Sequence, residues 1–188
     1  MKDDNSSVLD PDKDYELIRG LKTYASWAGI GGSPSYISRS LKTNPDIDQQ
    51  DREMIKGVFK LKDSGYCGVV YDGYSSATLP RKFMALTGAL VRNYKDVFYA
   101  TMNVYLAGLM DGLPVVDHRV TFIPDFTTQG QDKVPSWKRD IIIGHLMEKQ
   151  AEGKIMIVGV RDQDRLGDIY GAGIKEFIEG SYDLVEAT

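Results

Sequence analysis

Short apolar runs alternate with amphipathic stretches along most of this chain. Residues 67–71, Cys-Gly-Val-Val-Tyr, are apolar and partly β-branched, which predicts a buried strand. Residues 81–91 carry apolar side chains at helical spacing and predict a helix. The loop from Asp72 to Pro80 joins the two, so the centre of the sequence is predicted to be a strand, a loop of small residues and a helix.

The same alternation predicts four more strands and the helices between them. Expected strands are 96–100, 119–123, 154–159 and 182–185; expected helices are 15–27, 48–61, 101–110, one capped by Ser136, one from Asp162 to Tyr170, and 174–178. Residues 33–36 are expected to be loop, and 37–41 fit no single pattern. Strands that alternate with helices and lack hairpin turns indicate a parallel sheet covered on both faces.

Ligands of such sheets bind beyond the carboxyl ends of the strands. The Asp72 to Pro80 loop, Asp125 and residues 159–161 are all expected at such ends. The sequence therefore predicts an α/β fold with a five-stranded parallel sheet and places any ligand site at this edge.

Length and composition narrow the function. The chain has 188 residues, enough for one core but not for two comfortable domains. We expect a disordered acidic tail over 1–14 and a single domain over 15–188. The net charge of −4 does not favour nucleic acid as a partner of the whole protein. Without a secretion signal or an apolar run near the span length of about 18 residues, we expect a cytoplasmic protein that does not enter a membrane.

The cysteine, histidine and serine residues do not predict a disulfide, a metal site or a catalytic nucleophile. The single Cys67 excludes a disulfide framework, and one Cys with two scattered His residues does not predict a metal site. His145 is expected on the inner face of its helix, as a core or boundary residue and not as a catalyst. Ser75 and Ser76 do not lie in the Gly-x-Ser-x-Gly pattern of a nucleophilic serine.

The central loop has the layout of a phosphate-binding P-loop without its residues. The P-loop pattern is Gly, four residues, then Gly-Lys-Ser/Thr. On this pattern Asp72 replaces the first Gly, Ala77 the second, Thr78 the Lys and Leu79 the hydroxyl. A shift by one residue puts Leu79 on the Lys and Pro80 on the hydroxyl, so neither frame matches. An ordinary strand–loop–helix connection is the alternative interpretation of this stretch.

The electrostatic energy of these residue changes can be estimated. An ammonium about 4 Å from a phosphate oxygen contributes roughly 4 kcal/mol at an effective dielectric constant of about 20, and a carboxylate there costs as much. The missing Lys and the added Asp72 both oppose a polyphosphate, and Pro80 removes a backbone N–H from the turn.

The order of elements resembles the AAA+ ATPase domain of bacterial replicative helicase loaders of the DnaC/DnaI type and of IstB-type ATPases. The resemblance covers about Ala28 to Val185 and rests on these stretches: Ala28-Gly29-Ile30 with Tyr36 and Leu41, the helix at 48–61, the strand at 68–71, the helix at 101–110, Trp137 to Leu146, and Leu166 to Gly171. It implies a three-layer P-loop fold with the strand order of AAA+ proteins.

The departures from this family fall on its catalytic positions. The two acids of the Walker B strand align with Pro124 and Asp125, so only the second is present. The sensor 1 Asn aligns with Val160, the arginine that completes a neighbouring site with Gly173, and the sensor 2 arginine with Phe177. Phosphoryl transfer needs metal, charge compensation and a positioned water together. The resemblance therefore implies a pseudo-ATPase without ATP or Mg²⁺ as a cofactor.

Two sets of residues follow from this interpretation. The vestigial nucleotide site is predicted at Gly73, Ser75, Ser76, Thr78, Lys82 and Asp125; interaction surfaces are predicted at Arg81, Lys82, Arg92, Trp137, Lys138 and Arg139. A solvated helix face is the alternative interpretation for Arg81, Lys82 and Arg92, and a plain carboxylate at a strand end for Asp125.

The resemblance implies action through protein contacts in DNA replication, as adaptor, antagonist or inactive subunit. The implied partners are a replicative helicase or its loader, or further copies of the chain in a homo-oligomer, and a phage or mobile element is a fitting source. Two alternatives stay open: a single-stranded DNA-binding accessory protein, which needs basic and stacking side chains, and a nucleotide-binding ATPase in which Arg81 or Lys82 replaces the missing Lys and Asp125 holds the metal.

Overall fold

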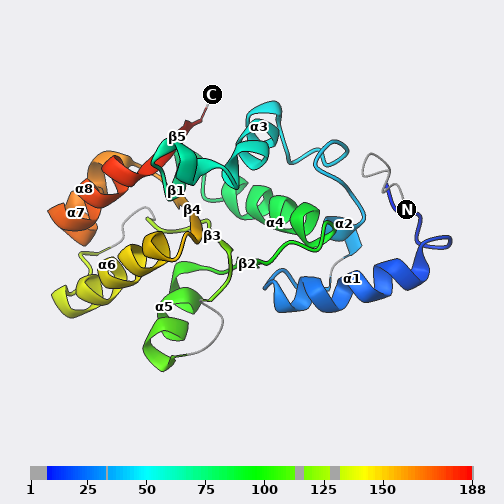
Figure 1. Cartoon of the computed structure of the whole chain (residues 1–188), viewed down its shortest axis with the longest axis horizontal. Helices are drawn as coiled ribbons and strands as arrows, with labels where there is room; N and C mark the ends of the chain where they lie inside the picture. Colours follow the sequence, from blue (N-terminus) through cyan, green and yellow to red (C-terminus); the bar gives the residue numbers. More distant parts are fainter. Residues whose placement is uncertain (1–7, 33, 113–116, 128–131, 188) are drawn as a thin grey trace.

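The strands form a parallel sheet at the centre of the molecule (Figure 1). The computed structural model describes residues 8–32, 34–112, 117–127 and 132–187. Within them the order is β2-β3-β4-β1-β5, with β1 paired to β4 and β5. The bounds are β1 Gly68–Asp72, β2 Val97–Tyr99, β3 Val120–Ile123, β4 Ile155–Val160 and β5 Tyr182–Glu186.

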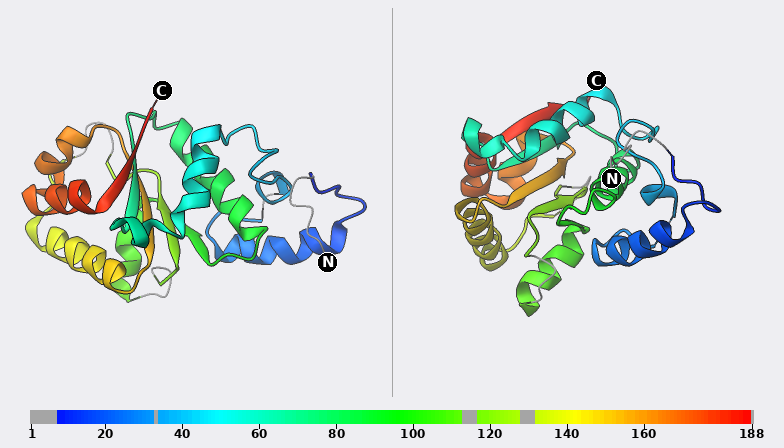
Figure 2. Two further views of the ribbon diagram at one scale, coloured as in Figure 1. Left: turned by 45° about the horizontal axis from the view of Figure 1, so that its top comes forward. Right: turned by 45° about the vertical axis from the view of Figure 1, so that its right-hand side comes forward.

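Helices cover both faces of this sheet (Figures 1 and 2). Helices α1 to α4 pack on one face and α5 to α8 on the other. Their bounds are α1 Tyr15–Trp27, α2 Pro34–Ile37, α3 Gln49–Val58, α4 Thr78–Val91, α5 Met102–Asp111, α6 Ser136–Ala151, α7 Leu166–Tyr170 and α8 Ala172–Ser181, with 3₁₀ turns η1 Leu61–Ser64 and η3 Gln163–Arg165. The three-layer α/β fold with a five-stranded parallel sheet is confirmed.

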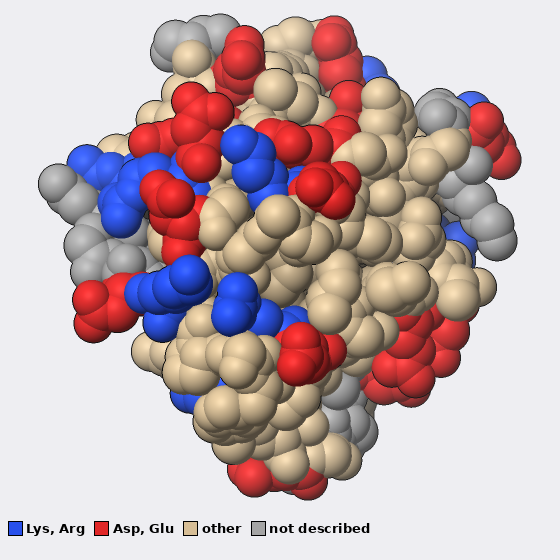
Figure 3. Space-filling view, turned by 90° about the vertical axis from the view of Figure 1, so that its left-hand side faces the viewer, with Lys and Arg blue, Asp and Glu red and all other residues tan. Residues whose placement is uncertain are grey.

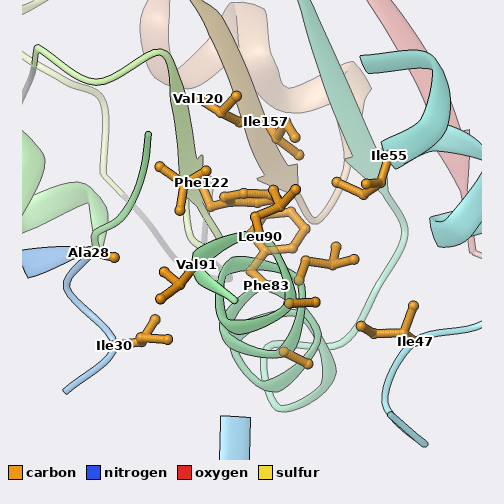
Figure 4. Packing of buried hydrophobic residues seen from close by; sticks show 14 of the residues in the cluster. Ala28, Ile30, Ile47, Ile55, Phe83, Leu90, Val91, Val120, Phe122 and Ile157 are labelled. Carbon is orange, nitrogen blue, oxygen red and sulfur yellow. The ribbon is translucent and has the colours of Figure 1, made fainter. Parts of the chain in front are cut away.

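The alternation of side chains along β1 creates two cores. Val69 and Tyr71 point to the α4 side of the sheet, and Val70 points to the α6 side. On the α4 side, the Phe83 ring lies 5.4 Å from the Phe122 ring, and Leu90 and Ile157 pack around them (Figure 4). Because both faces of the sheet are buried along β1 to β4, these strands read as nearly continuous apolar runs.

Capping residues fix two of the helix starts that the sequence predicts. Asp48 accepts a hydrogen bond from the Asp51 N–H, and Asp51 accepts one from the Asp48 N–H, each at 2.9 Å. This reciprocal pair is a capping box at the start of α3. Thr101 caps α5, which ends at Gly112 in the left-handed region.

Two local predictions were wrong. Residues 34–36, which were expected to be loop, form α2 together with Ile37, and α2 lies so close to α4 that a side chain on Gly88 would clash with the Tyr36 carbonyl. Helix α4 begins at Thr78, three residues before the predicted start. Pro80 fits there because the first turn of a helix needs no N–H from it.

The ends of other segments also differ from expectation. Within the tail expected over 1–14, Leu9 is buried and its N–H donates to the Ser38 carbonyl, while residues 1–7 lie outside the described residues. Residues 128–131, between β3 and α6, also lie outside the described residues. Pro135 and not Ser136 precedes α6 as its cap, and Ile141 is exposed.

Among the described helices, none is long and apolar enough to span a bilayer.

His145 lies at the boundary of the core, as expected. Its Nδ1 is 3.3 Å from a Glu148 carboxylate oxygen, its ring lies 5.7 Å from that of Tyr105, and its buried Nε2 has no hydrogen-bond partner among the described residues. Burial, with a smaller contribution from the charge of Lys149, lowers the pKa of His145.

The lowered pKa of His145 predicts a loss of stability in acid. The His145 ring takes up a proton less readily in the folded state than in the unfolded chain. The stability that its neutral form contributes is therefore fully present above the ordinary pKa of about 6.5, and it is lost as the pH falls through the folded pKa. We expect His145→Gln to lose less stability than the wild type between neutral pH and about pH 5. Urea midpoints of both proteins at the two pH values measure this; equal losses would contradict it.

Candidate functional site

The carboxyl end of β1 is tied to the segment that follows β4. The Asp72 carboxylate accepts hydrogen bonds from the N–H groups of Gly73 at 2.9 Å and Gln163 at 3.1 Å. Burial raises the pKa of Asp72, although both N–H groups oppose the rise. In the position of the first P-loop Gly, Asp72 therefore holds two loops together with its own negative charge.

Ser75 organises the start of α4. Its hydroxyl accepts a hydrogen bond from the Thr78 N–H at 3.1 Å and lies 2.8 Å from the Thr78 hydroxyl. A backbone N–H that a P-loop would offer to a phosphate thus already has a partner within the chain. Gly73, with φ of +75°, provides the turn that leads out of the strand.

Leu79 fills the space that the loop encloses. Its side chain is 2% exposed and lies against Gly159 of β4, where an added Cβ would come within 2.6 Å of Leu79 Cδ1 and would clash with the Pro124 carbonyl. The hollow left between this loop and the end of β3 has a volume of about 40 Å³ and is lined by Ser76, Asp125 and their neighbours. Ligand pockets usually measure about 300–1,000 Å³.

Lys82 points into the interior, where it meets two carboxylates. Its Nζ lies 2.6 Å from Asp48 Oδ2 and 2.6 Å from Asp51 Oδ2. The side chains of Lys82 and Asp51 are 6% and 0% exposed, and the Tyr71 hydroxyl donates to the other Asp51 oxygen at 2.8 Å. The Tyr74 ring covers the ammonium, with its centroid 5.3 Å from Nζ. We call Asp48, Asp51, Tyr71, Tyr74 and Lys82 the Lys82 cluster.

The charges of the Lys82 cluster stabilise one another against burial. Burial disfavours the charged form of Lys82, but the two carboxylates outweigh it and raise the pKa of Lys82. For Asp48 burial is likewise outweighed, by Lys82 and the Asp51 N–H, so its pKa is lowered. Asp51 is buried more deeply, and burial raises its pKa in spite of the hydrogen bonds from Lys82, the Asp48 N–H and Tyr71. The cluster fastens α3 to α4 beside the end of β1.

Asp125 caps a helix. Its Oδ1 accepts a hydrogen bond from the Met102 N–H at 2.7 Å, at the start of α5. Burial raises the pKa of Asp125, and burial together with this nearby charge raises the pKa of Tyr99 to about 12. The contact fits the interpretation of Asp125 as a carboxylate at a strand end.

The structure separates the predicted interaction residues on α4. Arg81 is exposed in the first turn, whereas Lys82 is buried in its cluster and so leaves the candidate surface. Arg92 is half-buried at the far end of the helix, where its guanidinium donates to the Ser38 carbonyl at 3.0 Å.

The predicted residues on α6 lie on the other face of the sheet. Trp137 is 50% exposed, and Lys138 Nζ lies 5.3 Å from the centroid of its ring. Arg139 is half-buried against Gly171. On the side of the molecule that carries α6, α7 and α8, basic and acidic side chains are interspersed and form no single basic patch (Figure 3).

The Lys82 cluster was not predicted from the sequence. Asp48 and Asp51 were recognised only as a cap, and Lys82 lies 31 residues after Asp51. A signal was nevertheless present, because Lys82 follows Leu79 by three residues and precedes Leu86 by four, on the apolar side of α4. A charged residue at such a position predicts a buried partner.

Comparison with known proteins identifies the fold. No family model and no curated protein matches the sequence. A crystal structure of the DnaC helicase loader matches with a TM-score of 0.57 and 13% identity, over 83% of this chain and all of the other. A crystal structure of a DNA replication initiation factor matches with a TM-score of 0.57 and 14% identity, over 82% of this chain and 50% of the other. The chain therefore has the α/β fold of these structures.

Proposed function

We propose that this chain, which has the fold of the DnaC helicase loader, does not hydrolyse ATP and acts through protein–protein contacts in DNA replication. The observation that carries the proposal is the packing at the end of β1. Leu79 occupies the space against Gly159, and Lys82 is held by two carboxylates of α3.

The partners of these side chains support the proposed absence of a bound Mg²⁺–nucleotide. To reach a phosphate, Lys82 has to leave Asp51 as a buried, unpaired carboxylate, which costs about 3–5 kcal/mol. Arg81 is exposed on α4, and Asp125 already accepts a backbone hydrogen bond. The interpretation with relocated catalytic residues is therefore disfavoured, because Lys82 is paired with two carboxylates and Asp125 accepts a backbone hydrogen bond.

The proposed role is that of an adaptor, an antagonist or an inactive subunit for a replicative helicase or its loader. Two helix starts are candidate contacts: the exposed Arg81 on α4, and the exposed Trp137 with the half-buried Lys138 on α6. Because the two helices cover opposite faces of the sheet, they belong to two separate contact surfaces.

Titration calorimetry tests the proposal. We expect no saturable heat with Mg²⁺–ATP at millimolar concentration, and saturable binding to the replicative helicase or to an active loader at micromolar concentration. Arg81→Glu and Trp137→Ala are each expected to weaken one surface, whereas Lys56→Glu, at an exposed position of α3, serves as the control.

Two results would contradict the proposal. Saturable Mg²⁺–ATP binding with turnover would contradict the claim that the chain does not hydrolyse ATP. Absence of binding to both helicase and loader at micromolar concentration would contradict the claim that it acts through protein contacts in DNA replication.

Single-stranded DNA is the second candidate partner, and one place in the structure favours it. The exposed side chains of Lys95 and Arg119 lie 5.7 Å and 5.2 Å from the ring centroid of Phe59, so cations and an aromatic ring meet there. Fluorescence anisotropy with labelled oligonucleotides separates the candidates, because DNA binding through phosphates weakens steeply with salt. No binding at low salt would exclude DNA.

A further inference from the structure

Helix α1 carries a second apolar stripe beside the one that it buries. Ile18, Leu21 and Ala25 are buried against the rest of the fold. Leu17, Tyr24 and Trp27 remain 41%, 47% and 67% exposed. With Gly20, they fall within an arc of about 80° on the helix. We call Leu17, Gly20, Tyr24 and Trp27 the outer stripe. Helix α1, which carries it, lies at the edge of the molecule in Figure 2.

The outer stripe leads into an aromatic groove. The ring of Tyr24 lies 5.5 Å from that of Trp27 and 5.7 Å from that of Tyr94, which is 63% exposed. A hollow of about 270 Å³ opens between them, with Val91 and Val97 in its lining. Tyr94 has a φ of +52°, an uncommon conformation for a bulky residue. Exposed apolar surface of this kind marks interaction sites.

The spacing of the outer stripe fits a helix as the occupant. Its members follow one another by three, four and three residues, the pattern of a helix–helix seam. Gly20 lies near its middle, and a Cβ added there would meet nothing within 4 Å. A second helix can therefore approach closely at this point, with aromatic side chains on one side of the crossing and Leu17 on the other.

The charges at the two ends of the outer stripe indicate which helix can bind it. The amino-terminal end is acidic: Asp10, Asp12, Asp14 and Glu16 lie near it, against Lys13 and Arg19. At the carboxyl-terminal end, Lys95 lines the hollow and is exposed, while the neighbouring Asp96 pairs with His118. The outer stripe is thus complementary to its own copy in the reverse direction, which also sets the helix dipoles antiparallel.

We propose that the outer stripe pairs antiparallel with the outer stripe of a second copy of this chain, across a twofold axis between Gly20 and Tyr24. Trp27 of each copy then lies against Leu17 of the other, and the acidic end of each α1 lies near Lys95 of the other. This contact is isologous, so it closes as a dimer. It is separate from the Lys82 cluster and from the candidate surfaces on α4 and α6.

Sedimentation velocity over concentrations from low to several hundred micromolar tests the dimer. We expect the sedimenting mass to rise from one copy to two as the concentration increases. Trp27→Ser is expected to weaken the dimer by about 30-fold or more, as for a tryptophan that anchors an interface. Gly20→Gln blocks the close approach while it raises helix propensity, so loss of the dimer cannot come from unfolding of α1.

A matched control and a cross-linking pattern sharpen the test. Gly144→Gln places the same side chain on α6, where a Cβ also meets nothing within 4 Å, and is expected to leave the dimer unchanged. With a short bismaleimide, Gly20→Cys is expected to link to itself, and Leu17→Cys to Trp27→Cys when the two proteins are mixed. Burial raises the pKa of native Cys67 to about 11, so this thiol reacts slowly at neutral pH.

Three results would overturn the proposal. The first is a protein that stays monomeric at every concentration. The second is a dimer that Trp27→Ser and Gly20→Gln do not weaken. The third is linkage of Leu17→Cys to itself in preference to Trp27→Cys, which indicates parallel helices.

Discussion

Replacement of Lys82 by Met is expected to lower the free energy of unfolding by about 3–5 kcal/mol. The substitution keeps a long side chain but leaves the fully buried Asp51 without its ammonium partner at 2.6 Å. The Tyr71 hydroxyl and the Asp48 N–H remain as donors, but neither carries a positive charge. Urea unfolding followed by circular dichroism measures the change.

Two further variants isolate the cause of this loss. Arg81→Met changes the exposed neighbour of Lys82 and is expected to stay within about 0.5 kcal/mol of the wild type. Lys82→Met combined with Asp51→Asn removes both buried charges, so we expect it to be more stable than Lys82→Met alone. Equal effects of Lys82→Met and Arg81→Met would show that the cluster does not hold α3 to α4.

Leu79→Ala is expected to cost about 2–5 kcal/mol. Leu79 is 2% exposed and lies against the backbone of Gly159, so its removal leaves a cavity that the strand cannot close. The size of the loss measures how tightly the loop packs on the sheet. Thermal or urea unfolding of the variant provides it.

Leu184→Ala is the matched control for this prediction. Leu184 is 43% exposed on the edge strand β5, so the same change is expected to cost less than about 1 kcal/mol. If Leu79→Ala is no more harmful than Leu184→Ala, the loop is open in solution and the basis for the proposed loss of nucleotide binding fails.

The elements of the fold were predictable because their signals are local. Four of the strands, β1 to β4, are mainly apolar runs bounded by polar or turn residues, and the cap at Asp48 and the stop at Gly112 are marked by single residue types. Helix α2 escaped prediction because it has only four residues and depends on the bare backbone of Gly88 for its place. Leu9 was missed because it is one apolar residue in an acidic stretch.

The location of the candidate site was predictable, but the side-chain contacts within it were not. The topology alone placed the loop and Asp125 at the carboxyl ends of the strands, and the missing P-loop residues could be read directly. The contacts that replace the P-loop residues could not be predicted. The partners of Lys82, Asp51 and Asp48, precede it by 31 and 34 residues in the chain. Pairing over such a distance is decided by packing and leaves only a weak trace in the local pattern.

The counter-charges of Lys82 are covalently part of the chain, and this has a consequence for timing. A motor protein of this fold exchanges the anion beside its lysine in every cycle, and the exchange times the release of its partners. Asp48 and Asp51 cannot be consumed or swapped, so their effect is the same whatever the ratio of ATP to ADP in the cell. The lifetime of a complex on such a scaffold is set by its dissociation rate and by the abundance of competitors.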